Sequence, residues 1–168
     1  KADIQTKFIR GLRVTDKNII KIIESVLIDF NSDIVNALKK KGLEAISINT
    51  KNNNIINVIP EKEELGFVGI PDKINTDIIK NIIDKDQIPV VAPLGLGRKN
   101  EPYNINGDTA AGAIAKSLNA RRLLLMTNVE GVLDKEKKLI TEISSSKILE
   151  MIKDEIIIGG MIPKINTC

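Results

Sequence analysis

Short apolar runs alternate with helical segments in the second half of the chain, and this alternation constrains the fold more than any other feature. Ile88–Ala92 has no charged side chain, and Arg122–Thr127 carries Leu-Leu-Leu-Met at its centre, so both are predicted as buried strands. Asp108–Leu118 and Ser144–Ile152 have helical spacing, and the polar, glycine-containing loop Pro93–Gly107 precedes the first of these helices. Strands that alternate with helices pair in parallel. The sequence therefore predicts an α/β fold with a mainly parallel sheet.

The first half of the chain begins with a long predicted helix. Apolar side chains recur at helical spacing from Thr15 or Asp16, either of which is a suitable N-cap, to about Lys41. Gly42 favours the end of this helix, and Asn31–Asp33 is a candidate break into two helices. The other predicted elements are strands at Leu43–Ile48, Ile55–Ile59 and Gly66–Ile70 and a helix at Thr76–Ile83. The first two of these strands indicate a hairpin or a short antiparallel excursion.

The composition excludes several classes of chemistry. The sequence contains no histidine, and its only cysteine is Cys168, so histidine-activated nucleophiles, histidine metal ligands, intrachain disulfides and thiolate zinc clusters are excluded. The remaining groups are Lys, Arg, carboxylates, amides and backbone N–H groups, which suit anions and phosphates. A net charge of +3 and 2% aromatic residues argue against a nucleic-acid partner. No apolar run approaches the roughly 20 residues of a membrane helix, so we expect no membrane partner and a cytoplasmic location.

Polar residues that follow the predicted strands indicate where a ligand would bind. In open parallel sheets, ligands bind beyond the carboxyl ends of the strands. Helix N-termini at Asp108 and near Lys164 would face the same edge, and such termini attract anions. The residues expected in one crevice are Asn104, Asn106, Asp108, Asn128 and Lys164.

These residues also have interpretations without a function. Asn104 and Asn106 suit turns in which the side chain bonds its own backbone. Asp108 suits a plain N-cap, and Lys164 is one of many lysines that water could solvate. Arg13, which lies between two apolar residues, suits the edge of a strand or the surface.

Known phosphate-binding motifs match poorly. Gly95–Asn100 contains the first two glycines of the dinucleotide fingerprint but lacks the third. Gly159 and Gly160 precede Lys164, but the spacing is not that of the P-loop and no Ser or Thr follows the lysine. Neither segment by itself indicates a nucleotide site.

Three motifs in chain order carry a resemblance to a known family. They are Gly11-Leu-Arg-Val-Thr-Asp16, Tyr103-Asn-Ile-Asn-Gly-Asp108 followed by Thr-Ala-Ala-Gly, and Gly159-Gly-Met-Ile-Pro-Lys164. The segments Leu65–Gly69, Ile88–Pro93 and Val129–Leu133 add to it in the same order. Together they resemble the amino-acid kinase family, and within it the members that phosphorylate N-acetyl-L-glutamate. The resemblance implies a three-layer αβα sandwich with a mainly parallel sheet, truncated at both ends of this chain.

The resemblance implies transfer of the γ-phosphoryl group of ATP to the side-chain carboxylate of N-acetyl-L-glutamate, a step of arginine biosynthesis. Arg13 would pair with the substrate α-carboxylate, and Asn104 would hydrogen-bond the same substrate. Asp108 would hold active-site lysines in place, and Lys164 would stabilise charge on the transferred group. The nucleotide would be bound by Asn128, Val129, Glu130, Gly131, Val132, Leu133, Gly159, Gly160 and Met161. Mg²⁺ would arrive with ATP, and no carboxylate cluster argues for a metal site of the protein's own.

The resemblance also implies a single domain over residues 1–168 in a homo-oligomer, a dimer or a dimer-based assembly. Residues 1–120, approximately, would bind acetylglutamate and form the dimer, and residues 121–168 would begin the nucleotide-binding part. The family usually has Asp where this chain has Asn128. Members of the family contain further segments that these 168 residues do not include. We therefore expect the 168 residues alone to be a poor or inactive kinase. Two alternatives stay open: a catalytically silent binding domain, supported by Asn128, and a sister kinase acting on another carboxylate or a carbamate.

Overall fold

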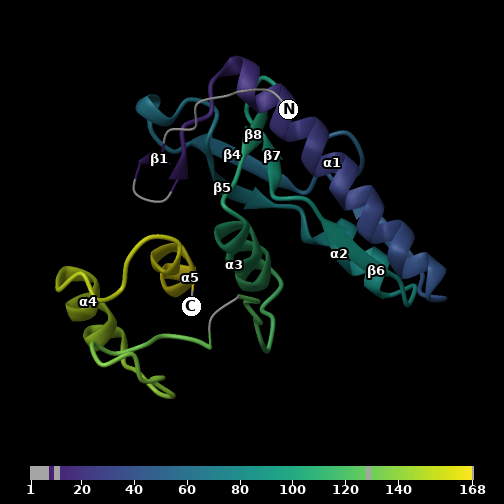
Figure 1. Cartoon of the computed structure of the whole chain (residues 1–168). Coiled ribbons are helices and arrows are strands. Elements are labelled where there is room, and N and C mark those ends of the chain that lie inside the picture. Colours follow the sequence, from purple (N-terminus) through teal and green to yellow (C-terminus); the bar gives the residue numbers. More distant parts are fainter. Residues whose placement is uncertain (1–7, 10–11, 128–129, 168) are drawn as a thin grey trace.

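Figure 1 shows the computed structural model of the chain, which describes residues 8–9, 12–127 and 130–167. The strands are β1 (Phe8–Ile9), β2 (Leu12–Arg13), β3 (Ala45–Ile48), β4 (Ile56–Pro60), β5 (Gly69–Ile74), β6 (Ile88–Val91), β7 (Leu94–Leu96) and β8 (Pro102–Asn104). The helices are α1 (Lys17–Lys40), α2 (Thr76–Ile83), α3 (Gly107–Ser117), α4 (Ser145–Lys153) and α5 (Met161–Thr167), with a 3₁₀ turn η1 (Glu63–Leu65) between β4 and β5.

The long helix α1 is continuous. It begins because the Asp16 carboxylate accepts the backbone N–H groups of Asn18 and Ile19 at 2.7 and 2.8 Å. The predicted break at Asn31 is wrong, because the side chain of Asn31 is buried and donates to the Val90 carbonyl at 2.8 Å. A polar residue in the middle of the helix thus faces a strand and bonds it, and the helix has no reason to end there.

The strands pair in a mixed pattern. A four-stranded sheet has the order β5-β4-β7-β8, and β3 and β6 form a separate two-stranded pair. Pairing is parallel for β3–β6 and β4–β7 and antiparallel for β4–β5, β7–β8 and β1–β2. The predicted α/β class is therefore confirmed, with more antiparallel pairing than the sequence predicted.

The connections between strands correct two predictions. The predicted hairpin between the strands now identified as β3 and β4 is wrong, because β3 pairs in parallel with β6, with Ala45 opposite Ile88. The hairpin partner of β4 is β5, with Pro60 opposite Gly69. The segment Pro93–Gly107, predicted as a loop, contains the short antiparallel pair β7–β8.

The core lies between α2, α3 and the strands that they cover, and α1 packs separately on β3, β6 and β8 (Figure 1). Its buried members are mostly isoleucines: Ile48, Ile55, Ile56, Val58, Ile79, Ile82, Tyr103, Ile105 and Ala110. Burying each isoleucine side chain contributes about 1.5–3 kcal/mol. The predicted helix Thr76–Ile83 coincides with α2, which supplies two of these residues.

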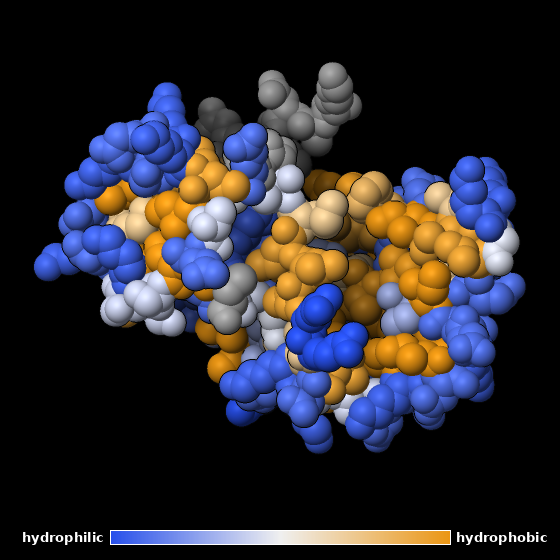
Figure 2. Space-filling view, turned by 90° about the horizontal axis from the view of Figure 1, so that it is seen from below, coloured by the Kyte–Doolittle hydropathy of each residue, from blue (hydrophilic) through white to orange (hydrophobic). Residues whose placement is uncertain are grey.

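The predicted strand Arg122–Thr127 is wrong. The segment has no regular secondary structure, and Leu124 and Met126 are 82% and 88% exposed. No other strand of the described residues pairs with it, and an apolar run forms a strand only where a neighbour accepts its backbone hydrogen bonds. Figure 2 shows hydrophobic side chains over much of the face seen from below.

Two short helices complete the chain. The predicted helix Ser144–Ile152 is confirmed as α4, whose N-cap hydroxyl on Ser144 accepts the N–H of Lys147 at 3.3 Å. The last helix, α5, begins at Met161, so Lys164 lies within it and not in a loop ahead of it. Figure 1 shows α5 beside α3, and the two helices are in contact.

Candidate active site

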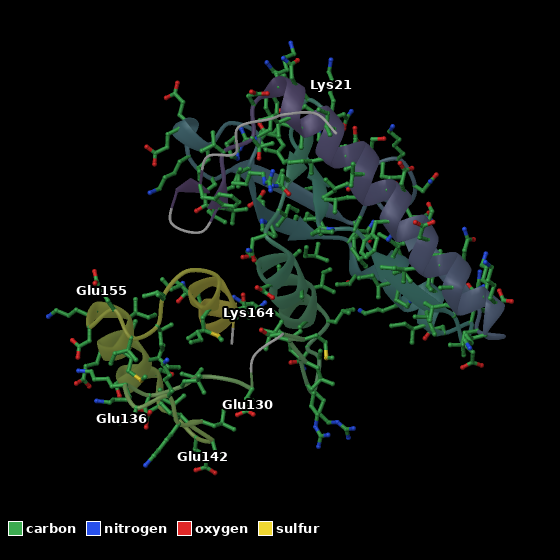
Figure 3. All side chains as sticks on the ribbon, viewed as in Figure 1. Lys21, Glu130, Glu136, Glu142, Glu155 and Lys164 are labelled. Carbon is green, nitrogen blue, oxygen red and sulfur yellow. The ribbon has the colours of Figure 1, made fainter. Side chains whose placement is uncertain are left out.

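A partly buried ion pair joins α3 to α5. The Nζ of Lys164 lies 2.9 Å from both Asp108 carboxylate oxygens, and the two side chains are 24% and 18% exposed. Figure 3 shows Lys164 on α5, beside α3. The structure thus brings together the two residues that the sequence analysis assigned to catalysis.

Local structure leaves the Asp108 carboxylate available for this pair. The N-cap of α3 is Asn106, whose side-chain oxygen accepts the backbone N–H of Thr109 at 3.1 Å. The interpretation of Asp108 as a plain N-cap is therefore wrong, and Asp108 lies in the first turn, where the helix dipole favours an anion. A Cβ on Gly112 would lie 2.3 Å from Cγ2 of Thr167, so the absence of a side chain there permits α5 to approach α3.

Arg13 and Asn104 lie on opposite sides of one backbone segment, Leu65–Val68. On one side, the Thr15 N–H donates to the Leu65 carbonyl at 3.0 Å, and the Phe67 N–H donates to the Thr15 carbonyl at 2.7 Å. On the other side, the Asn104 N–H donates to the Phe67 carbonyl at 2.9 Å. Asn104 is therefore bonded to this segment directly, and Arg13 is linked to it through Thr15, whose hydroxyl donates to the Arg13 carbonyl at 3.0 Å.

The Arg13 guanidinium is exposed and lies over an aromatic ring. Its Cζ is 5.3 Å from the centroid of the Phe8 ring, within the range of a cation–π contact. Such a contact at the surface is worth about 0.5–1 kcal/mol, so an anion could draw the guanidinium away at small cost.

A cavity of about 360 Å³ adjoins these residues. It is lined by Leu12, Glu61, Lys62, Glu64, Leu65, Val68, Gly69, Asn106, Thr109, Ile162, Asn166 and Thr167. Asn106, expected in the crevice, lines it, whereas Arg13, Asn104, Asp108 and Lys164 do not. Each of these four residues lies within two positions of a lining residue along the chain.

A second cavity, of about 280 Å³, gathers part of the predicted nucleotide site. Of the predicted residues, Gly131, Val132, Leu133 and Met161 line it, together with Asp134, Lys137, Ile156, Ile157 and Ile158. Glu130 is exposed and is not part of this lining, and Gly159 and Gly160 form the turn that leads into α5. The predicted residues Asn128 and Val129 lie outside the described residues.

Gly66 was not predicted as a site residue, and Thr15 was predicted only as an alternative N-cap. The cap of α1 is Asp16, and Thr15 is completely buried beside Gly66. The signal for Gly66 was a glycine inside an otherwise strand-like run, which indicates a close approach of two backbones.

The described residues offer neither a metal-binding cluster nor a membrane-spanning helix. Within residues 8–9, 12–127 and 130–167, no group of three or more Asp, Glu, Cys or His side chains could hold a metal ion. In the same part of the chain, no helix combines the length and the apolar character that crossing a bilayer demands.

Known proteins resemble this chain along nearly its whole length. The curated relatives include a protein of Pelagibacter ubique (strain HTCC1062) named acetylglutamate kinase, 54% identical over 166 residues, which are 99% of this chain and 58% of that protein. A protein of the same name from Ruegeria pomeroyi (strain ATCC 700808 / DSM 15171 / DSS-3) is 46% identical over 168 residues, 99% of this chain and 58% of that protein. The chain thus spans somewhat more than half the length of these relatives.

Solved structures with the same fold are also known. The crystal structure of smu.665 from Streptococcus mutans UA159 superposes with a TM-score of 0.92 at 32% identity, over 98% of this chain and 67% of that chain. An N-acetylglutamate synthase from Neisseria gonorrhoeae, complexed with coenzyme A and N-acetyl-glutamate, gives a TM-score of 0.79 at 20% identity, over 97% of this chain and 38% of that chain, and shows the fold alone. The family model of the amino acid kinase family matches residues 1–168. This chain therefore belongs to the amino acid kinase family.

Proposed function

We propose that the protein phosphorylates the side-chain carboxylate of N-acetyl-L-glutamate with ATP, a step of arginine biosynthesis. The observation that carries the proposal is the position of α5, which lines both cavities and bears Lys164. Ile162, Asn166 and Thr167 face the cavity beside Arg13 and Asn104, and Met161 faces the cavity formed with the 131–133 loop. Its relatives named acetylglutamate kinase support the choice of substrate.

The reaction needs positioned charge more than covalent help. An oxygen of the substrate carboxylate, already ionised near neutral pH, attacks the γ-phosphorus of ATP. The bond from that phosphorus to the β–γ bridging oxygen breaks, and ADP and the acyl phosphate form. Lys164 would stabilise the charge on the transferred group, and Asp108 would position Lys164 through the pair at 2.9 Å. No general base is required, which fits a sequence without histidine.

The substrate would be oriented by Arg13 and Asn104, which lie on opposite sides of the Leu65–Val68 segment. Arg13 would pair with the α-carboxylate, for which a planar guanidinium offers two parallel donors. Asn104 would hydrogen-bond the same molecule. In this proposal residues 1–120, approximately, bind the acetylated amino acid, and residues 121–168 begin the nucleotide-binding part of a single domain.

The nucleotide would bind at the second cavity. Gly131, Val132, Leu133 and Met161 line it, and the turn at Gly159 and Gly160 adjoins it. Glu130, Asn128 and Val129 complete the proposed set. The apolar lining from Ile156 to Ile158 fits a purine face better than it fits a metal ion. Mg²⁺ bound to the phosphates would supply further charge neutralisation. We place the protein in the cytoplasm as part of this proposal.

Hydroxylamine trapping tests the reaction directly. Acyl phosphates react with hydroxylamine to give hydroxamates, so the full-length gene product is incubated with MgATP and N-acetyl-L-glutamate. Aspartate, glutamate, N-acetylaspartate and carbamate are run in parallel, with ADP release recorded for each. We expect hydroxamate with N-acetyl-L-glutamate alone. ADP release with another acceptor would indicate a sister kinase, and no turnover in a folded protein that binds both reactants would indicate a silent binding domain.

We also propose that the protein is a homodimer or a dimer-based assembly. An exposed apolar stripe on α1 supports this, because Ile22, Val26, Phe30 and Ile34 recur every four residues and are 45%, 57%, 61% and 37% exposed. Val26→Asp with Phe30→Asp should therefore convert the dimer to monomers in analytical ultracentrifugation. Lys21→Glu, elsewhere on the same helix (Figure 3), serves as the control for a change of charge. A wild-type monomer would exclude the assembly.

A further inference from the structure

We infer that Thr15 and Gly66 are positioning residues that set the spacing between Arg13 and Asn104 and so determine the affinity for the acetylated amino acid. The inference deepens the proposed function and rests on it for the role of Arg13 and Asn104. Its structural basis is that both residues are tied to one segment, Leu65–Val68. Neither Thr15 nor Gly66 is placed to contact a reacting atom.

Every polar group of Thr15 is committed to this arrangement. Its N–H donates to the Leu65 carbonyl at 3.0 Å, and its carbonyl accepts the Phe67 N–H at 2.7 Å. Its hydroxyl donates to the Arg13 carbonyl at 3.0 Å. The side chain is 0% exposed, so no water competes for these bonds. Thr15 therefore fixes the backbone of Arg13 relative to Phe67.

Phe67 connects this arrangement to the other substrate residue. Its N–H bonds to Thr15, and its carbonyl accepts the N–H of Asn104 at 2.9 Å. Val68, the next residue, forms an isolated parallel β-bridge with Asn104. A shift of Thr15 relative to Phe67 therefore changes the separation of Arg13 from Asn104.

Gly66 allows the two backbones to approach. Its φ of +67° lies in the region that favours glycine, and a Cβ there would be 2.4 Å from the Thr15 carbonyl oxygen and 3.2 Å from its carbonyl carbon. Both of these neighbours are backbone atoms, so no side-chain rotation relieves the clash. A side chain at position 66 must push Thr15, and with it Arg13, away from the Leu65–Val68 segment.

Kinetics separate positioning from a general loss of structure. In the full-length protein, Gly66→Ala should raise the KM for N-acetyl-L-glutamate by about 10- to 100-fold, because a misplacement of about 1 Å has effects of that order. Thr15→Val, which removes only the hydroxyl bond to Arg13, should raise it by a smaller factor, and Thr15→Ser should restore it. The KM for ATP should stay within about twofold in each variant, since no nucleotide contact changes.

Gly42→Ala is the matched control. Gly42 has a φ of +79°, similar to that of Gly66, but a Cβ there would meet no atom within 4 Å. Alanine at position 42 therefore also has a positive φ but displaces no neighbour. We expect lower stability and an unchanged KM for N-acetyl-L-glutamate. An unchanged KM in Gly66→Ala and Thr15→Val, or equal increases for both substrates, would overturn the inference.

Amide hydrogen exchange provides a readout that does not depend on activity. Gly66→Ala should speed exchange at the N–H groups of Thr15, Phe67 and Asn104 together, and Gly42→Ala should not. If the wild type forms no hydroxamate from N-acetyl-L-glutamate, the proposed function fails, and exchange alone decides the positioning. In that case, joint loss of protection supports the shared segment, and full protection at Asn104 contradicts it.

Discussion

Lys164 and Asp108 show how much depends on single side chains at this site. The pair is less than one quarter exposed, so loss of either partner leaves a charge in a poorly hydrated place. Lys147 and Glu150 form a pair with the same separation of 2.9 Å, but both of their side chains are more than half exposed. Lys147, in an exposed pair of the same length, therefore serves as the control for a substitution of Lys164 in its partly buried pair.

Lys164→Ala should lower kcat for hydroxamate formation by about 10²–10³, the usual effect of removing a preorganised donor. The KM for N-acetyl-L-glutamate should change little, because Arg13 and Asn104 remain. Lys147→Ala should leave kcat unchanged, since an exposed pair contributes only about 0–1 kcal/mol to stability. Steady-state kinetics of the three proteins measure this, and equal kcat values for wild type and Lys164→Ala would remove Lys164 from the chemistry.

Tyr103 gives a prediction at alkaline pH. Burial, and then the nearby Glu101 carboxylate, raise the pKa of Tyr103 above its ordinary value of 10.0. Between the two pKa values, the folded state keeps the Tyr103 proton and the unfolded chain loses it. The stability that Tyr103 contributes is therefore complete below pH 10 and is lost as pH rises through the folded pKa. Urea unfolding at about pH 8 and about pH 11 should show a smaller loss for Tyr103→Phe than for wild type. Equal losses would contradict the shift.

Among the elements, α3 and α5 depend on the absence of a side chain at Gly112. A Cβ there would lie 2.3 Å from Cγ2 of Thr167. Gly112→Ala should therefore lower the free energy of unfolding by about 1–3 kcal/mol, the usual cost of overpacking. Thr167→Ser removes only the colliding methyl group, and in that background Gly112→Ala should be neutral or stabilising by up to about 1 kcal/mol, because alanine favours a helix. Urea denaturation of the four proteins tests this, and additive effects would rule out the contact.

The junction of α1 with β3 and β6 is polar at its centre. Asn31 donates to the Val90 carbonyl at 2.8 Å and accepts a bond from the Ser47 hydroxyl, which in turn accepts from the Asn49 side chain at 2.9 Å. Asn31→Ala removes the bonds to the Val90 carbonyl and from the Ser47 hydroxyl and should cost about 1–3 kcal/mol in the free energy of unfolding. Ser32→Ala, at an exposed neighbour, should stay within about 0.5 kcal/mol. Similar losses for both variants in urea denaturation would contradict a buried network.

Helices were predicted well from the sequence, and strand pairing was not, for one physical reason. Spacing and caps are local, so α1, α2, α3 and α4 could be located from residues such as Asp16 and Ser144. Pairing joins distant residues, such as Ala45 and Ile88, and no local pattern specifies it. The strand β7 was not predicted, because Gly95 suggests a loop. In the structure, position 95 requires glycine for a different reason: a Cβ there would lie 2.5 Å from the side chain of Val58.

On the scale of the whole molecule, the site could be predicted only in part. The residues of the Asp108–Lys164 pair were predicted from motifs whose family resemblance implies their roles, and the structure brings them together. The roles of Thr15 and Gly66 depend on a contact between segments some fifty residues apart in the chain, which only the folded structure reveals. The exposure of Leu124 likewise depends on what pairs with its segment and not on its own apolar character.

The irregular segment that follows α3 should be cleaved by trypsin before the helices α1 and α3 are. Arg121 and Arg122 are exposed and lie in irregular backbone, whereas Lys116 lies within α3. In the 168-residue chain, we expect trypsin to cleave after Arg121 or Arg122 before it cleaves within α1 or α3. Mass spectrometry of a time course identifies the first products. Earlier cleavage at Lys116 would show that α3 opens more readily than this segment.

The distance along the chain between Asp108 and Lys164 has a consequence for the order of assembly. The two residues are 56 positions apart, and the ion pair closes that loop. Closing such a loop has an entropic cost that local helices do not bear, so α3 can form long before its partner lysine arrives. The proposed kinase chemistry therefore depends on a contact that forms only after both α3 and α5 are in place, so a chain in which α5 is still unfolded holds Asp108 without its lysine.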